Sequence, residues 1–342
     1  MESFDIPVVL FLFKRYDTVL RILERISQVK PQKLYLICDG PRNDQEAVAV
    51  SKCREEVERH ITWPCEVIKN YAEENRGIYD RIGLGAKWVF TREEKAIFLE
   101  DDNLPEVTFF AYSRELLERY EHDTRVLWIN GTNYLARYTP GNNASYMFTK
   151  HLLPCGWASW ASKFPYYYDG EMSLLKDKYI QSLLPNTYEN QALYRQQRHC
   201  MYQTLRKKEL GQPISWDFQM AFSVRIHGMY GISPCCNQIK NIGVDLNSEH
   251  GGTSYKNPMT RRFCGMDSHP LELPLRHPAV VQVDPAYEKK IEKIILYPFK
   301  IKMFVALSKA VKPLLGMDTY DSLSTVLKKR KQNHKNRSRK DG

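Results

Sequence analysis

Apolar and polar positions follow two different periods over the first 130 residues. Nearly continuous apolar runs, such as IPVVLFLF near the start, are typical of strands buried on both faces. Between them, apolar residues recur every three or four positions, as Leu20, Leu23 and Ile26 do, which is typical of amphipathic helices. The pattern predicts strands at 6–13, 33–39, 65–72, 95–100 and 125–131, with helices at 17–29, 44–60, 78–92 and 107–123.

Strands and helices that alternate at this pace form right-handed βαβ units. We therefore expect an α/β protein with a Rossmann-like, mostly parallel central sheet and helices on both faces. The alternation ends after Asn130, where residues 131–170 are rich in Gly, Asn, Tyr, Trp and Pro. A helix in PISWDFQMAFSVRIHG is predicted to have Ser215 as its N-cap and to end at Gly228.

Composition narrows the class of protein. The chain has 342 residues, of which 43% are hydrophobic and 26% charged, as in soluble globular proteins. The first apolar run is too short for a membrane span, and acidic residues precede it, unlike a signal peptide. None of the eight cysteines forms a C-x-x-C pair, which favours free thiols and a cytoplasmic location.

The net charge of +10 is concentrated at the C-terminal end. Residues 288–342 carry 15 Lys/Arg and 5 Asp/Glu, so the rest of the chain is neutral. Because the body offers no basic face, we do not expect nucleic-acid binding. Residues 283–342 are predicted to form an amphipathic segment and a basic, disordered tail, which would place the protein peripherally at the inner face of an anionic cell membrane. The alternative is a helix packed on the domain, followed by a disordered end.

Unusual polar residues follow three of the predicted strands. The first strand is followed by Lys14 and Arg15, the second by Asp39, and the fourth by Glu100-Asp101-Asp102. The carboxyl ends of parallel strands meet at one edge of a sheet, where ligands bind, so these side chains can converge on one ligand. Adjacent carboxylates suit Mn²⁺ or Mg²⁺ bridging to phosphate oxygens, although three acids at a turn can also be a solvated loop.

Other enzyme classes fit poorly. A dinucleotide-binding enzyme would need G-x-G-x-x-G after the first strand, and the segment FKRYDT contains no glycine. The phosphate-binding loop G-x-x-x-x-G-K-[ST] is also absent.

Four residues after Asn130 are further candidates. Asp217 can accept a proton from an acceptor hydroxyl, or it can be an ordinary first-turn acid of a helix. The aromatic faces of Trp157 and Trp216 suit sugar rings, but tryptophan in a Gly-rich loop, as at position 157, is more often core. His250 is either a metal or phosphate ligand or a solvent-facing loop residue.

These motifs, in this order over residues 6–253, resemble glycosyltransferases of the GT-A fold. The similarity is to N-acetylglucosaminyltransferase I and related bacterial family 2-like enzymes. It rests on the acidic D-x-D-type segment FLEDDNLPEVTFF, on CGW, on SWDFQ and on SEHGG. A histidine that contacts uracil in that family is replaced near Gly85, so the chain departs from the pattern there.

The resemblance implies a role for each matching residue. Asp102 and His250 would bind the cation, Glu100 and Asp101 would contact the ribose and the donor sugar, and Arg15 would meet the diphosphate. Asp39 would contact the nucleobase and Ser248 would close over the nucleotide. Asp217 would be the catalytic base of an inverting transfer, with Trp157 and Trp216 near the acceptor.

The resemblance also implies an activity and a domain organisation. Residues 1–130 would bind the nucleotide sugar, with UDP favoured, and 131–282 would bind a saccharide or lipid-linked glycan acceptor, as in bacterial surface polysaccharide synthesis. Two alternatives remain: a nucleotidyltransferase that makes sugar nucleotides, and a catalytically inactive binding protein with the same fold.

Overall fold

The computed structural model describes residues 4–244 and 254–321. Its main element is an eight-stranded sheet in the order β3-β2-β1-β4-β8-β6-β9-β7, next to a two-stranded sheet of β10 and β5. The strands are β1 (Val8–Leu12), β2 (Lys33–Cys38), β3 (Glu66–Tyr71), β4 (Lys95–Glu100), β5 (Asn103–Pro105), β6 (Val126–Asn130), β7 (Tyr146–Thr149), β8 (Trp157–Trp160), β9 (Tyr230–Pro234) and β10 (Ile239–Asn241).

Six of the eight strands in the main sheet run in one direction, which confirms the predicted mostly parallel α/β fold. β8 is antiparallel to both of its neighbours, β4 and β6, and the edge strand β7 is antiparallel to β9. The sequence predicts a Gly-rich loop where β8 lies. All four residues of β8 are buried, because this strand joins the two parallel parts of the sheet.

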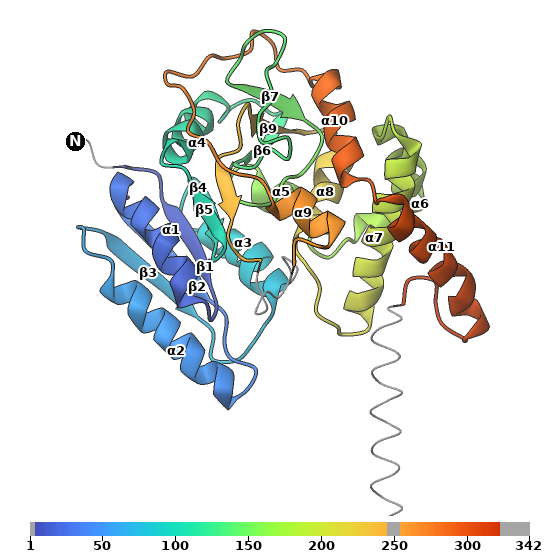
Figure 1. Cartoon of the computed structure of the whole chain (residues 1–342), viewed down its shortest axis with the longest axis horizontal. Helices are drawn as coiled ribbons and strands as arrows, with labels where there is room; N and C mark the ends of the chain where they lie inside the picture. The colour runs from blue at the N-terminus through green and yellow to red at the C-terminus, as the bar shows by residue number, and fades with distance from the viewer. Residues whose placement is uncertain (1–3, 245–253, 322–342) are drawn as a thin grey trace, which may run out of the picture.

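Helices cover both faces of the sheet (Figure 1). They are α1 (Tyr16–Val29), α2 (Asp44–Arg59), α3 (Gly85–Val89), α4 (Thr108–Arg119), α5 (Phe164–Tyr167), α6 (Lys178–Leu183), α7 (Gln191–Glu209), α8 (Asp217–Ile226), α9 (Pro258–Cys264), α10 (Pro285–Ile295) and α11 (Phe299–Leu314). Successive residues of a strand point to opposite faces. Accordingly, Val8 and Leu10 pack with α1, α2 and α4, whereas Val9 and Phe11 pack with α3, α5 and α8.

Two local details differ from the predictions. The helix expected at 78–92 begins as a π-helix, η1 (Tyr79–Leu84), before α3. The prediction that Ser215 is the N-cap of the next long helix is wrong, because α8 is preceded by Trp216, which makes no side-chain cap. The helix does end before Gly228, whose φ of +63° is the left-handed conformation that glycine adopts easily. All eight cysteines are free thiols, as predicted.

The first helix of the predicted C-terminal extension, α10, belongs to the folded body. Tyr287 and Ile291 are completely buried and pack on Met147 and Leu153. The sequence boundary at residue 283 therefore does not separate a surface segment from the domain, because α10 supplies part of the core.

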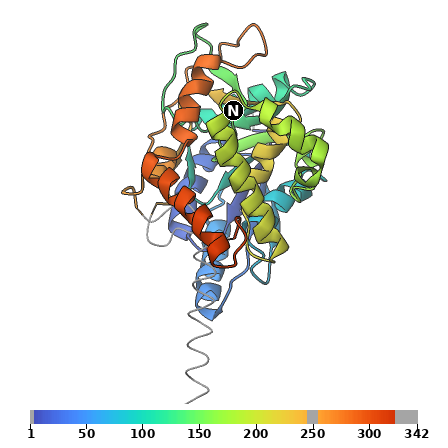
Figure 2. The same cartoon turned by 90° about the vertical axis from the view of Figure 1, so that its right-hand side faces the viewer.

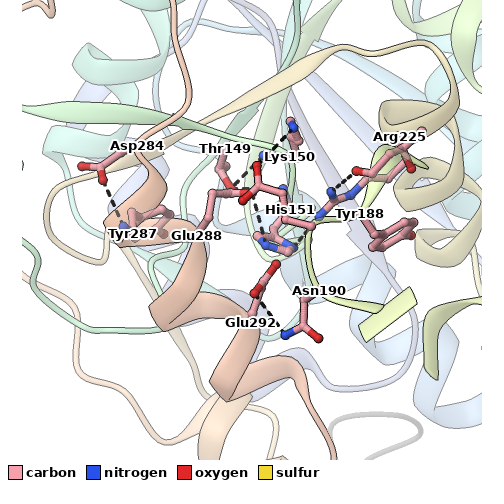
Figure 3. Close-up of polar contacts among 12 residues, drawn as sticks. Thr149, Lys150, His151, Tyr188, Asn190, Arg225, Asp284, Tyr287, Glu288 and Glu292 are labelled. Carbon is pink, nitrogen blue, oxygen red and sulfur yellow. Dashed lines mark hydrogen bonds and ion pairs between the residues drawn. The ribbon is translucent and has the colours of Figure 1, made fainter. Parts of the chain in front are cut away.

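A buried polar network also fixes α10 to the sheet and to α8 (Figure 3). Arg225 Nη2 donates to His151 Nδ1 at 3.2 Å, so the ring proton of this histidine lies on Nε2, which is 3.4 Å from Glu288 Oε2. Thr149 Oγ1 donates to the other oxygen of Glu288. Burial, with the Arg225 charge adding to it, lowers the pKa of His151 well below its ordinary value. A neutral imidazole thus lies between a guanidinium and a carboxyl group.

Glu288 makes the stability of this network depend on pH. Burial raises its pKa from 4.5 to about 7, against the lowering effect of the Thr149 hydrogen bond. The folded chain therefore holds this proton more tightly than the unfolded chain, and the stabilisation disappears as pH rises from 4.5 through 7. Relative to Glu288→Gln, which stays neutral, the wild-type protein should lose about 2 kcal/mol of unfolding free energy between pH 5 and pH 8.

Urea unfolding at both pH values measures this difference. Glu24→Gln, at an exposed position of α1, is the control and should show no such change relative to wild type. If the wild-type and Glu288→Gln free energies run parallel from pH 5 to pH 8, Glu288 does not take up a proton on folding.

Candidate active site

The polar residues predicted at the strand ends line one cavity of about 230 Å³. β1, β2 and β4 are adjacent and parallel, so the segments after them meet at one edge of the sheet. The predicted residues on its wall are Arg15, Asp39, Glu100, Asp101 and Asp102. Lys14, also expected at this edge, lies on the wall as well. Further wall residues, which were not predicted as site residues, include Phe11, Ile37, Arg42, Asn75, Ile78, Arg81, Ile82, Pro213 and Ile214.

One arginine and the burial of the site both affect the charge of the three strand-end acids. Arg15 Nη2 lies 2.6 Å from Asp101 Oδ1 and 3.6 Å from Asp102 Oδ2. Burial raises the pKa of Asp101 to about 6, even though Arg15 opposes this shift. Burial, with the neighbouring charges of Asp102 and Asp101 adding to it, raises the pKa of Glu100 well above its ordinary value. The raised pKa of Glu100 and the guanidinium of Arg15 both act to reduce the repulsion among the neighbouring carboxylates.

Asp102 is held in place by buried polar contacts. Asn103, 1% exposed, donates to Asp102 Oδ1 and accepts from Gly156 N at 2.7 Å. β10 pairs with β5 and brings Gly243 against the acid. A Cβ at position 243 would lie 2.5 Å from Asp102 Oδ2 and 2.8 Å from Arg15 Nη1, so this approach requires glycine.

The acids fit a divalent cation that is shared with a ligand. In the described part of the chain, no three His, Cys, Asp or Glu side chains are grouped so as to hold a metal by themselves. Mg²⁺ and Mn²⁺ are commonly held by one or two carboxylates together with phosphate oxygens. The predicted second ligand His250 lies outside the described residues, as does Ser248. Of the two residues predicted to bind the cation, Asp102 is the one that the described part of the chain contains, and it lies on the cavity wall.

Asp39 has a different environment from the one predicted. Its carboxylate accepts four hydrogen bonds, two from Gly40 N and Arg76 N to Oδ1, and two from Gly77 N and the Asn75 side chain to Oδ2. These bonds fix the segment 75–77 against the end of β2. Asp39 thus organises the cavity wall with its carboxylate already engaged, so it can contact a nucleobase only by sharing these oxygens.

Arg81 is a site residue that the sequence analysis missed. It is 7% exposed and donates to Asn70 O at 2.6 Å from the π-helix η1. π-helical turns are rare and are often found at functional sites. The sequence does contain an indication of this role, because Arg81 is a charged residue on the apolar face that Ile78 and Ile82 form in a predicted helix.

Asp217 lies at the first turn of α8, close to the acidic end of the cavity. Its Oδ1 is buried without a hydrogen-bond partner in the part of the chain that the structure describes. Its charge also raises the pKa of Glu100, although burial and the charges of Asp102 and Asp101 contribute more to this shift. Pro213 and Ile214, in the segment leading to α8, line the same cavity. The structure thus brings Asp217, far away in sequence, next to the strand-end acids.

The two tryptophans are core residues. Trp157 and Trp216 are 1% and 3% exposed. Trp157 stacks between Phe98 and Trp128, with ring centroids 3.8 and 4.1 Å apart, and Trp216 lies 5.9 Å from Trp128. Their faces are covered, so the prediction that they bind the acceptor is incompatible with their burial. They instead pack α8, and with it Asp217, against the sheet.

Comparisons with known proteins give only distant similarities. No protein-family model and no curated protein sequence matches the chain. Among solved structures, a mannosyltransferase from Pyrobaculum calidifontis in complex with GDP-mannose and Mn²⁺ is 12% identical, covering 67% of this chain and 69% of its own, with a TM-score of 0.35. A UDP-glucose pyrophosphorylase without ligand is 8% identical, covering 69% and 93%, with a TM-score of 0.35. Scores this low carry no conclusion about function, which must come from the site.

Proposed function

We propose that this protein is an inverting glycosyltransferase. It takes a sugar from a nucleoside-diphosphate sugar, with UDP favoured by the sequence resemblance, and transfers it to a hydroxyl of a saccharide or lipid-linked glycan in surface polysaccharide synthesis. The observation that carries the proposal is the cavity at the ends of β1, β2 and β4, where cationic, acidic and apolar walls meet.

Each wall of the cavity suits one part of the donor. Phe11, Ile37 and Ile78 offer an apolar surface for a nucleobase. Arg15 and Arg42 can neutralise a diphosphate, because a guanidinium forms paired hydrogen bonds with phosphate oxygens. The strand-end acids lie at the position where the sugar and a cation would follow.

In this proposal Asp217 is the base. Its carboxylate, close to the strand-end acids, would accept the proton of the acceptor hydroxyl. As the hydroxyl oxygen of the acceptor bonds to the anomeric carbon, the bond from this carbon to the diphosphate oxygen breaks and the nucleoside diphosphate leaves with the electron pair. A single displacement inverts the anomeric configuration. A divalent cation bound at Asp102 would neutralise charge on the departing diphosphate.

Thermal unfolding with UDP-, GDP-, CMP- and dTDP-sugars, each with and without Mn²⁺, tests donor binding. We expect one nucleotide to raise the midpoint by several degrees in the presence of Mn²⁺, since a ligand at 100 times its Kd stabilises by about 2.7 kcal/mol. If no nucleotide sugar shifts the midpoint, the proposal is wrong.

The same preparation separates the proposal from its alternatives. A glycosyltransferase releases nucleoside diphosphate when an acceptor is supplied. A nucleotidyltransferase instead releases pyrophosphate from a nucleoside triphosphate and a sugar phosphate. A binding protein would be stabilised by the nucleotide sugar but would release neither product.

A further inference from the structure

Helix α11 presents an apolar face that the rest of the described chain leaves uncovered. Of the 16 large apolar side chains that are exposed in the described residues, seven lie between positions 299 and 315. They are Phe299 (75%), Met303 (48%), Phe304 (67%), Leu307 (62%), Val311 (42%), Leu314 (84%) and Leu315 (41%). Soluble proteins rarely leave such a contiguous apolar surface exposed unless it binds something.

The exposed residues form one stripe along the helix. Phe299, Met303, Leu307 and Val311 follow one another at four-residue steps, which places them on one side of the helix. The other side of the helix is less exposed: Ile301, Val305 and Lys309 are half-buried, and Lys312 is buried and donates to Thr319 O in the segment after the helix. Figures 1 and 2 show α11 at the outside of the molecule, beside α7 and away from α1 and α2. The stripe is therefore accessible over the whole length of α11.

The charges around this stripe identify its partner. α11 contains four lysines and no acidic residue. Lys300 and Lys302 are exposed beside the apolar side chains. In sequence, residues 322–342 add eight Lys/Arg and one Asp. Apolar residues flanked by lysines fit a surface that combines an apolar interior with negative charge, as a membrane of anionic lipids does.

We propose that α11 lies in the surface of an anionic lipid membrane, with Met303, Phe304 and Leu307 in the acyl region and Lys300 and Lys302 among the headgroups. No described helix is long and apolar enough to cross a bilayer. The 16 residues of α11 span about 24 Å, less than the hydrocarbon thickness, so the helix would lie in the plane of the surface. Pairing of two α11 stripes in a dimer is the less favoured occupant, because it would gather lysines with no acid on the helix to balance them.

Co-sedimentation of the full chain with vesicles tests this assignment. The probes are vesicles of phosphatidylcholine alone and of phosphatidylcholine with about 30% phosphatidylglycerol. We expect binding to the anionic vesicles, weakened by raising NaCl from 0.1 to 0.5 M, because salt screens the lysines. Binding to neutral vesicles should be at least about tenfold weaker, since each basic residue near the surface contributes about 1 kcal/mol.

Two double variants separate the apolar and the electrostatic contributions. F304S/L307S should weaken binding to anionic vesicles by at least about tenfold, since it removes two large buried side chains from the membrane. K300E/K302E should weaken it by a similar factor. All four positions are exposed, so folding is preserved. The control V48S/Y179S removes apolar side chains that are 73% and 68% exposed elsewhere and should bind like wild type.

Three outcomes would overturn the proposal. The first is absence of binding to the anionic vesicles. The second is wild-type binding by F304S/L307S, which would assign the interaction to the basic tail rather than to α11. The third is a wild-type dimer in light scattering that F304S/L307S converts to a monomer, which would make a second copy the occupant. None of these outcomes depends on donor binding or transfer, so the proposed function is tested separately.

Discussion

Asp217→Asn is expected to lower the rate of sugar transfer by about 10²- to 10⁴-fold, the range over which general bases contribute. Asparagine has nearly the same size and keeps a carbonyl oxygen, but it cannot take the proton of the acceptor hydroxyl. Donor binding should change little, because Asp217 does not line the donor cavity. Loss of turnover with retained donor binding is the signature of a group that acts in the chemical step.

Release of nucleoside diphosphate with saturating donor and acceptor measures this effect, and isothermal titration with donor and Mn²⁺ measures binding. Asp44→Asn is a matched control, because Asp44 is also a first-turn acid, at the start of α2, and is exposed. It should leave both quantities unchanged. If Asp217→Asn retains turnover within a factor of about three, Asp217 is not the base.

Asp102→Asn should weaken cation-dependent donor binding by at least ten- to a hundredfold. Residues that merely orient a metal ligand cost this much when replaced, and loss of the ligand itself should cost no less. Glu100→Gln should weaken donor binding much less. In the unliganded protein the raised pKa of Glu100 favours the protonated form, which glutamine resembles. The two acids are two positions apart in the same strand-end segment, so the comparison separates a ligand from a nearby acid.

Titration of the donor into each variant with and without Mn²⁺ gives the result. The ratio of the two affinities should approach one for Asp102→Asn and stay close to the wild-type ratio for Glu100→Gln. Equal loss in both variants would contradict the assignment of Asp102 as the cation ligand and favour a cation shared by the whole acidic segment.

Much of the first half of the fold follows from local pattern. The five predicted strands and four predicted helices before residue 131 all occur within a few residues of their expected bounds, with a π-helix at the start of the third. Each apolar run there is long, and its period distinguishes strand from helix. The strands after residue 131 do not follow from local pattern, because β7, β8 and β9 are identified by pairing with strands far away in the chain.

The candidate site was also predictable only in part. The sequence places Arg15, Asp39 and Asp102 at strand ends, and the parallel sheet places those ends together. It does not reveal that the Asp39 carboxylate is occupied by the segment 75–77, nor that Arg81 turns toward the cavity edge. Those contacts depend on the path of a loop, and loop paths are set by hydrogen bonds that carry no sequence period.

The sequence by itself determined the α/β alternation, the polar strand ends and the basic C-terminal end, because each is a property of neighbouring residues. Only the tertiary structure decided that Trp157 is core, that Asp217 lies beside Glu100, and that α10 is buried while α11 is exposed. α11 is the more apolar of the two C-terminal helices, yet α10 is the one that is buried, so their different burial has a non-local reason. Thr149 of β7 and His151, just after this strand, give α10 partners for Glu288, and no described element covers the apolar stripe of α11.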